Sequence, residues 1–181
     1  LRAAAEERSV LLREMHHRIK NDLSLVESLA RLQEGVLAEG PAAAAFAAFG
    51  ERVRSIALVH DRLSRESAEG TVDAAAYLRD LVSTLGQTRG DPRGSVRALV
   101  ESCELTLPAA RAVTLGLLVN ELGMNALKHA FGDDRPGTIR VRLERAAPGR
   151  LRLSVEDDGA GVSWPPARAG LGTAIVEALS G

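Results

Sequence analysis

The chain has 181 residues, of which 45% are hydrophobic and 26% are charged, a balance typical of a globular protein. Its 23 basic and 24 acidic side chains give a net charge of −1, which argues against a nucleic-acid partner. No apolar run reaches the ~20 residues of a membrane span, and the single Cys103 excludes an intrachain disulfide framework. We therefore expect a cytoplasmic domain without a membrane segment.

The first third of the chain predicts two helices that form an antiparallel hairpin over residues 1–67. In the first helix, apolar residues recur at steps of three and four: Leu12, Met15, Ile19, Leu23, Val26 and Ala30. After a turn at Gly40 and Pro41, the second helix repeats the pattern with Phe46, Phe49, Val53, Ile56, His60 and Leu63. One partner helix cannot cover the first stripe, so we expect two hairpins to form a dimeric four-helix bundle.

Residues 68–181 predict a second, α/β domain, joined by a polar linker over residues 66–71. Helices are expected over residues 73–85 and 108–130, and a last helix near Gly172. A strand is expected around residues 96–100, after a turn at 90–94, and a strand hairpin over residues 139–143 and 151–155. Together the two halves predict an α+β fold.

His17 is the candidate nucleophile of the first helix. At ~100° per residue it points away from the apolar stripe, among polar neighbours that include Asn21, whereas His16 lies on the flank of the stripe. A neutral imidazole nitrogen is a competent nucleophile near pH 7. The alternative is an ordinary solvated histidine. A shared metal ion is disfavoured, because adjacent histidines diverge by ~100°. His60, on the apolar stripe, predicts a hydrogen-bonded core histidine.

The helix over residues 108–130 carries a polar row at helical spacing, made of Glu121, Asn125, Lys128 and His129. A carboxylate, an amide oxygen and an ammonium in one row suit a magnesium ion and phosphates. The alternative is a solvated helix face.

Two glycine-containing segments follow. Asp157, Gly159 and Gly161 come directly after a strand, where the carboxylate can accept from an exocyclic amine and the glycines let the backbone approach a flat ring. Gly170, Gly172 and Thr173 open the last helix, whose free N–H groups favour phosphate. The alternative for the segment at Asp157–Gly161 is an ordinary turn, and the alternative for the segment at Gly170–Thr173 is an ordinary helix cap. In this order, the three segments predict a nucleotide site.

These motifs resemble the kinase core of bacterial sensor histidine kinases, in the HWE-related branch whose phosphoacceptor box reads His-Arg-x-Lys-Asn. Residues 17–21 match that box, residues 120–130 the N box, 157–161 the G1 box and 170–173 the G2 box. The resemblance covers nearly the whole chain. It implies a dimerisation and phosphotransfer hairpin over residues 1–67, followed over residues 68–181 by an ATP-binding domain of the GHKL type, a two-layer α/β sandwich.

The resemblance also implies a role for each motif residue. His17 would be phosphorylated by ATP and would pass the phosphoryl group to an aspartate on a response-regulator receiver domain. Asn125 would ligate Mg²⁺, with Glu121 beside the metal and phosphates. Contacts to phosphate, ribose and adenine would come from the remaining residues: Lys128, His129, Asp157, Gly159, Gly161, Gly170, Gly172 and Thr173. A homodimer is implied, and we expect an upstream sensor domain to be absent from this chain.

Three features depart from the family pattern. Only residues 162–169 separate Gly161 from Gly170, which fits the short lid of this branch. Ser154 stands where the tryptophan of the Trp-x-Glu signature would precede Glu156. Related domains continue beyond the last helix, so we expect the ATP domain to be truncated at Gly181. Two other functions stay open: a response-regulator phosphatase, with Asn21 orienting water, and a nucleotide-gated pseudokinase scaffold.

Overall fold

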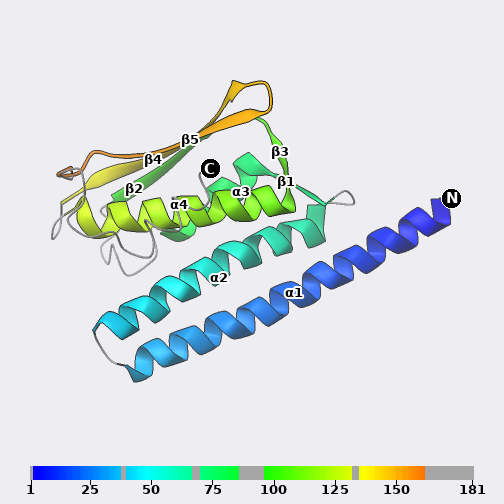
Figure 1. Ribbon diagram of the computed structural model, residues 1–181, viewed down its shortest axis with the longest axis horizontal. Coiled ribbons are helices and arrows are strands. Elements are labelled where there is room, and N and C mark those ends of the chain that lie inside the picture. The colour runs from blue at the N-terminus through cyan, green and yellow to red at the C-terminus, as the bar shows by residue number, and fades with distance from the viewer. Residues whose placement is uncertain (1, 38–39, 67–69, 86–95, 132–134, 162–181) are drawn as a thin grey trace. The chain divides into compact units, whose positions relative to one another are not determined.

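The computed structural model describes residues 2–37, 40–66, 70–85, 96–131 and 135–161. The helices are α1 (Arg2–Val36), α2 (Pro41–Glu66), α3 (Ala74–Leu85) and α4 (Ala109–His129), and the strands are β1 (Thr71–Asp73), β2 (Val96–Ser102), β3 (Thr106–Pro108), β4 (Gly137–Ala147) and β5 (Arg150–Asp157) (Figure 1). Every predicted helix and strand within these ranges is confirmed. The predicted turn at 90–94, residues 67–69 of the linker and the last helix near Gly172 lie outside the described residues.

Helices α1 and α2 pack side by side as the predicted antiparallel hairpin (Figure 1). The chain turns at Gly40, whose φ of 122° favours a residue without a β-carbon. Pro41 begins α2, where the N–H that proline lacks would have no helical partner. Ala30 and Val53 are buried on facing helices, as the stripes predict, but four other members of the predicted stripes are 37–45% exposed: Met15, Val26, Phe46 and Phe49.

A second apolar stripe on α1 was not predicted. It consists of Leu25, Leu29, Leu32 and Val36, which are 52–78% exposed and recur at steps of four, three and four. At ~100° per residue, these positions are turned about 100–160° around α1 from Ala30, which faces α2. We call this set the outer stripe.

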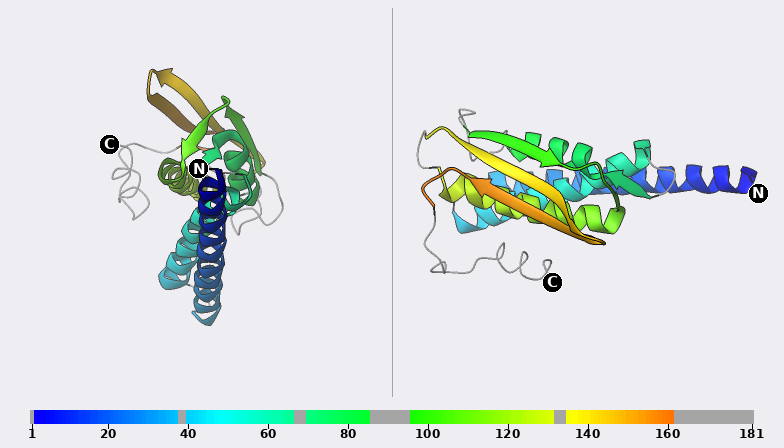
Figure 2. Two further views of the ribbon diagram at one scale, coloured as in Figure 1. Left: turned by 90° about the vertical axis from the view of Figure 1, so that its right-hand side faces the viewer. Right: turned by 90° about the horizontal axis from the view of Figure 1, so that it is seen from above.

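The α/β part of the chain contains a three-stranded sheet in the order β2-β4-β5, with β2 parallel to β4 and β4 antiparallel to β5 (Figure 2). Alternate residues of β4, namely Ile139, Val141 and Leu143, are almost completely buried on the face covered by α3 and α4. Arg140 and Arg142 alternate with them and form ion pairs with Glu101 on the other face. The alternation places one face of the sheet in the core.

Two glycines on α4 leave room for side chains of α3. A β-carbon at Gly116 would lie 1.7 Å from the hydroxyl oxygen of Tyr77, and one at Gly123 would lie 2.8 Å from Leu85 Cδ1. Tyr77 is fully buried, and this burial raises the pKa of its hydroxyl. These two side chains of α3 therefore occupy the space that a β-carbon at either position of α4 would take.

Strands β1 and β3 pair antiparallel, with Val72 opposite Leu107, and sequence reasoning missed both because each has only three residues. Two compact units divide the chain: Leu1–Asp73 with Thr106–Val113, and Ala74–Leu105 with Thr114–Gly181. Helix α4 begins in the first unit and continues in the second. Because the second unit spans both sides of β3, it is not continuous in sequence.

Candidate functional site

The imidazole of His17 is exposed on α1, as predicted. Asn21, one turn further along the helix, places its amide Nδ2 3.4 Å from His17 Nδ1. The nitrogen and oxygen of an asparagine amide exchange places on a 180° rotation, so the amide can either donate to Nδ1 or accept from Nδ1–H. Asn21 thus faces one of the two nitrogens of an accessible imidazole.

The neighbouring His16 is turned toward α2 instead. Its Nδ1 lies 3.0 Å from Nδ1 of His60, and both residues are half-buried. This burial lowers the pKa of both imidazoles, and the nearby charge of His16 lowers that of His60 further. His60 is hydrogen-bonded, as predicted, although it is half-buried rather than fully buried. Of the two adjacent histidines, His17 is therefore the one open to a large partner.

Charged side chains surround the exposed histidine on α1. Arg18 donates to Glu14 Oε1 at 2.8 Å, and this exposed ion pair lowers the pKa of Glu14. On the α2 side, Lys20 and Arg65 both donate to the carboxylate of Asp61. The face around His17 is polar, as its sequence predicts.

The polar row on α4 runs from a buried residue to exposed ones. Glu121 is only 6% exposed, whereas Asn125, Lys128 and His129 are exposed. All four residues lie on the part of α4 that belongs to the second compact unit, Ala74–Leu105 with Thr114–Gly181, which we call the α/β unit. The exposed part of the row thus presents an amide, an ammonium and an imidazole at the end of the helix.

The loop that follows β5 is built against this end of α4. Asp157 Oδ1 accepts a hydrogen bond from the Gly159 N–H at 3.0 Å, and the Ala160 N–H donates to the Ala130 carbonyl at 2.8 Å. A β-carbon at Gly159 would lie 2.4 Å from the Ala130 carbonyl oxygen, so glycine is required there. The structure therefore brings two of the three predicted motif segments together, although they are nearly 30 residues apart in sequence.

Sequence reasoning missed Asp158, which anchors the same loop. Its Oδ1 accepts from the Thr138 N–H at 2.7 Å, and its own N–H donates to the Thr138 carbonyl at 3.3 Å. These bonds join the end of β5 to the start of β4. No sequence signal singles out Asp158 from Asp157, because their difference lies in the direction of each side chain.

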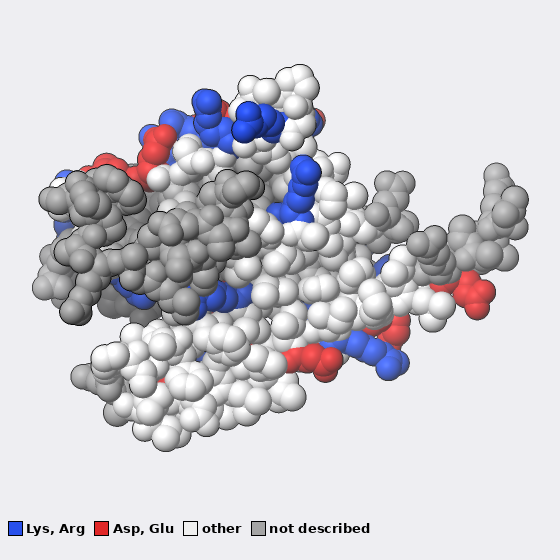
Figure 3. Space-filling view, in the orientation of Figure 1, with Lys and Arg blue, Asp and Glu red and all other residues white. Residues whose placement is uncertain are grey.

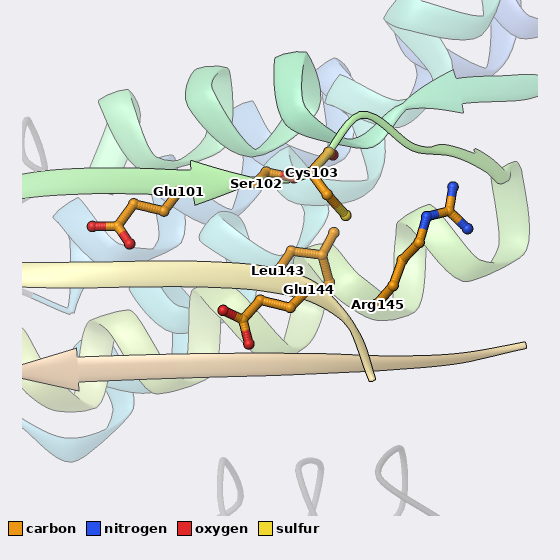
Figure 4. Close-up of a pocket in the computed structure, with 6 residues that line it drawn as sticks. All are labelled: Glu101, Ser102, Cys103, Leu143, Glu144 and Arg145. Carbon is orange, nitrogen blue, oxygen red and sulfur yellow. Dashed lines mark hydrogen bonds between the residues drawn. The ribbon is translucent and has the colours of Figure 1, made fainter. Parts of the chain in front are cut away.

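A small hollow of about 140 Å³ lies at this end of the sheet, lined by Thr138, Arg140, Glu156, Asp157 and Asp158. A larger hollow of about 580 Å³ lies at the opposite end of β4, lined by Glu101, Ser102, Cys103, Leu143, Glu144 and Arg145 (Figure 4). None of the predicted nucleotide residues lines the larger hollow. The motifs therefore point to the end of the sheet at Asp157 and not to the larger hollow.

Gly161 has a φ of 73°, a left-handed conformation that suits glycine at this position of the loop. Gly170, Gly172 and Thr173 lie outside the described residues. Among the described residues, no group of three or more His, Cys, Asp or Glu side chains could hold a metal ion. The exposed amide of Asn125 fits Mg²⁺, which takes oxygen ligands and usually keeps several waters and substrate phosphates.

The fold and site define a class of protein: a helical hairpin with an exposed histidine, joined to an α/β unit with a glycine-containing loop beside a polar helix end. Two family models match the chain, one described as histidine kinase over residues 14–89 and one as histidine kinase-like ATPase domain over residues 86–180. The chain belongs to the histidine kinase family. None of the described helices is long and apolar enough to span a membrane.

Several relatives and a solved structure are similar to the chain. Blue-light-activated histidine kinase 2 of Erythrobacter litoralis is 32% identical over 93% of this chain and 49% of its own length. The sensor histidine kinase PdtaS of Mycobacterium tuberculosis is 34% identical over 83% of this chain and 30% of its own length. The histidine kinase domain of an Erythrobacter litoralis blue-light-activated histidine kinase matches with a TM-score of 0.64 and 31% identity, covering 98% of this chain and 83% of that domain. The chain thus spans half or less of these curated relatives.

Proposed function

We propose that the chain is the core of a two-component sensor histidine kinase, in which ATP phosphorylates His17 and the phosphoryl group then passes to a response-regulator aspartate. The observation that carries this proposal is the exposed imidazole of His17 on a polar helix face, in a chain of this family. A nitrogen lone pair attacks the γ-phosphorus, the N–P bond forms, the bond to ADP breaks, and the ring loses its N–H proton to solvent.

The contact between Asn21 and Nδ1 favours Nε2 as the attacking nitrogen. When the amide presents Oδ1, it accepts from Nδ1–H and leaves the Nε2 lone pair free. Asn21 would then fix both the tautomer and the direction of the ring. Its role in the kinase reaction is that of a positioning residue.

The nucleotide would bind at the loop after β5 and the adjoining end of α4. Asp157 would accept from the adenine amine, while Gly159 and Gly161 shape the base pocket. Asn125 would hold Mg²⁺, which supplies charge neutralisation to the phosphates, with Glu121 beside it. Lys128 and His129 would contact phosphate or ribose, and Gly170, Gly172 and Thr173 would form the phosphate loop.

The phosphorylated histidine and the nucleotide site belong to two functional domains, which we place at residues 1–67 and 68–181. The matches of the two family models, which meet near residue 86, and the two compact units support two domains without fixing this boundary. We also propose a cytoplasmic location for this core.

A homodimer through the hairpin is supported by the outer stripe, whose four apolar side chains are all more than half exposed. Near the turn between α1 and α2, the face drawn in Figure 3 is mostly uncharged. Steps of four and three match the seam of a helix bundle, and burying each side chain contributes roughly 1.5–3 kcal/mol. A second copy of this hairpin offers the same stripe in return.

Labelling with γ-³²P-ATP and Mg²⁺ tests the kinase reaction. We expect a phosphoprotein that is labile in acid and stable in base, and complete loss of the label in His17→Ala. His16→Ala is the matched control, because it removes the adjacent histidine and leaves the exposed one. Retention of the label in His17→Ala together with its loss in His16→Ala would move the phosphate acceptor to His16.

A phosphatase activity toward the response regulator is the second candidate, because the exposed amide of Asn21 lies one turn from His17 and could orient water. Comparing dephosphorylation of a phosphorylated receiver domain by the wild type and by Asn21→Ala separates this role from phosphorylation. Failure of a full-length version of the protein to bind ATP in calorimetry would favour a pseudokinase scaffold instead.

A further inference from the structure

Lys20 lies on α1 between the exposed histidine and the second helix of the hairpin. At ~100° per residue it is about 60° from His17 around the helix and about 40° from His16. Residues three apart on a helix have Cβ atoms about 5–6 Å from each other, so Lys20 and His17 are neighbours. The Lys20 ammonium donates to Asp61 Oδ1 on α2. A single cation can therefore reach both the carboxylate on α2 and a group attached to His17.

Asp61 has a second cation, because Arg65 donates to its Oδ2 from one turn further along α2. The side chain of Asp61 is only 16% exposed, against 34% for Lys20. Burial alone would raise the pKa of Asp61, but the hydrogen bonds and charges of Lys20 and Arg65 hold it below its usual value. If the Lys20 ammonium moves away from Asp61, Arg65 still neutralises the carboxylate. The mostly buried charge of Asp61 is therefore not left unpaired.

The choice of lysine at this position is unusual for this chain. Of its 23 basic residues only Lys20 and Lys128 are lysines, and the rest are arginines. An ammonium is a compact charge on a flexible stem, with three donors that turn easily, whereas a guanidinium suits a fixed bidentate pair. Lysine is thus the better cation at a position where it exchanges one anionic partner for another. The arginine at position 65 suits a lasting ion pair with Asp61.

We propose that Lys20 binds the phosphoryl group on phosphorylated His17, and that Asp61 is a positioning residue that holds the ammonium beside His17 until that group arrives. The inference rests on His17 being the phosphorylated residue. A phosphoryl group offers three strong acceptor oxygens and, once fully ionised, more charge than a carboxylate, so it competes with Asp61 for the ammonium. The ion pair between α1 and α2 opens as the new one forms.

The test titrates the phosphoryl group itself in the full chain. Potassium phosphoramidate phosphorylates exposed imidazoles without ATP, and ³¹P NMR then follows the second ionisation of the phosphohistidine signal that is missing in His17→Ala. A neighbouring ammonium stabilises the dianion and lowers this pKa. We expect Lys20→Ala to raise it by roughly 0.2–0.7, the range of a largely exposed ion pair.

Asp61→Asn gives the sharper result, because it frees Lys20 from its competitor. The phosphoryl pKa should then fall below the wild-type value, in the direction opposite to Lys20→Ala. The double variant should match Lys20→Ala, since Asp61 acts only through Lys20. Lys20→Arg should restore part of the effect. Arg31→Ala, which removes a positive charge 14 residues from His17 on the same helix, should leave the wild-type value unchanged.

Equal pKa values in wild type and Lys20→Ala would overturn the inference, as would shifts of the same sign in Lys20→Ala and Asp61→Asn. Loss of ATP labelling combined with the expected phosphoramidate titrations would instead overturn the proposed kinase reaction and leave the assignment of Lys20 intact. If phosphoramidate produced no His17 signal, both proposals would be wrong.

Discussion

The hairpin and the α/β unit present their functional groups in different ways. On the hairpin, His17 projects from the solvent side of a regular helix, and its position needs only the helix and one cross-helix set of polar contacts. In the α/β unit, Asp157 ends β5 and Gly159 lies in the loop that follows, which hydrogen bonds fix to Ala130 after α4 and to Thr138 on β4. A site on one helix can be changed residue by residue, whereas a site between elements depends on close packing.

Ion pairs join α1 and α2 beside buried apolar residues such as Val59 and Leu63, whereas more of the buried apolar residues lie in the α/β unit. Glu27 accepts hydrogen bonds from Arg54 on the other helix and from Arg31 on its own. In the α/β unit, Tyr77, Val119 and Val141 are completely buried. Because long charged side chains and exposed leucines cover much of the hairpin, its stability should depend on a partner, while the core of the α/β unit should not.

The largest expected effect is on assembly of the hairpin. Placing glutamate at both Leu29 and Leu32 removes two apolar side chains from the outer stripe, at roughly 3–6 kcal/mol for two such residues. We expect the dimer to dissociate, as measured by multi-angle light scattering. Gln33→Glu, an exposed change on the same helix, is the control and should leave the mass unchanged. A wild type that is monomeric at high concentration would contradict a dimer altogether.

A packing change in the α/β unit should have the next largest effect. Gly116→Ala places a β-carbon against the buried Tyr77 hydroxyl and should destabilise this unit by about 3 kcal/mol, measured by urea unfolding. Gly35→Ala on α1, where nothing lies within 4 Å, should be neutral or stabilising. Tyr77→Phe should recover part of the loss in the double variant. Equal destabilisation at both glycines would show that packing density does not distinguish the two regions.

Nucleotide affinity should respond to one carboxylate of the loop. Asp157→Ala removes the proposed acceptor for adenine and should weaken ADP binding about tenfold, measured by isothermal titration calorimetry. Glu144→Ala is the matched control, because this exposed carboxylate lies in the hollow at the opposite end of β4. Weaker binding in the control than in Asp157→Ala would place the nucleotide elsewhere.

The smallest effect is a pH dependence in the hairpin. Burial lowers the pKa of His16 and His60, so the folded hairpin binds fewer protons than the unfolded chain. This contribution to stability is fully present above the unfolded pKa of about 6.5 and is lost as the pH falls below it. Thermal unfolding followed by circular dichroism should give a Tm that drops by a few degrees on acidification. Replacing both histidines with glutamine should reduce that drop, and an unchanged drop would assign it to other groups.

Most of the secondary structure could be predicted from the sequence, because helical stripes, strand alternation and Gly-Pro turns are local patterns. Strands β1 and β3 escaped because three residues are too few to show an alternation. The outer stripe escaped because its exposure depends on which side of α1 meets α2. The site residues could be selected by motif, but the anchoring roles of Asp158 and Ala130 depend on contacts between distant segments.

The sequence by itself determined the exposure of His17, since a helix period fixes which side chains oppose an apolar stripe. It also determined the family, through the order of its polar and glycine-containing motifs. Only the tertiary structure decided that the loop after β5 is fastened to the end of α4 and that Lys20 is shared with Asp61. Those contacts join residues at least 30 positions apart, and the distance between them is set by how the elements pack rather than by any local pattern.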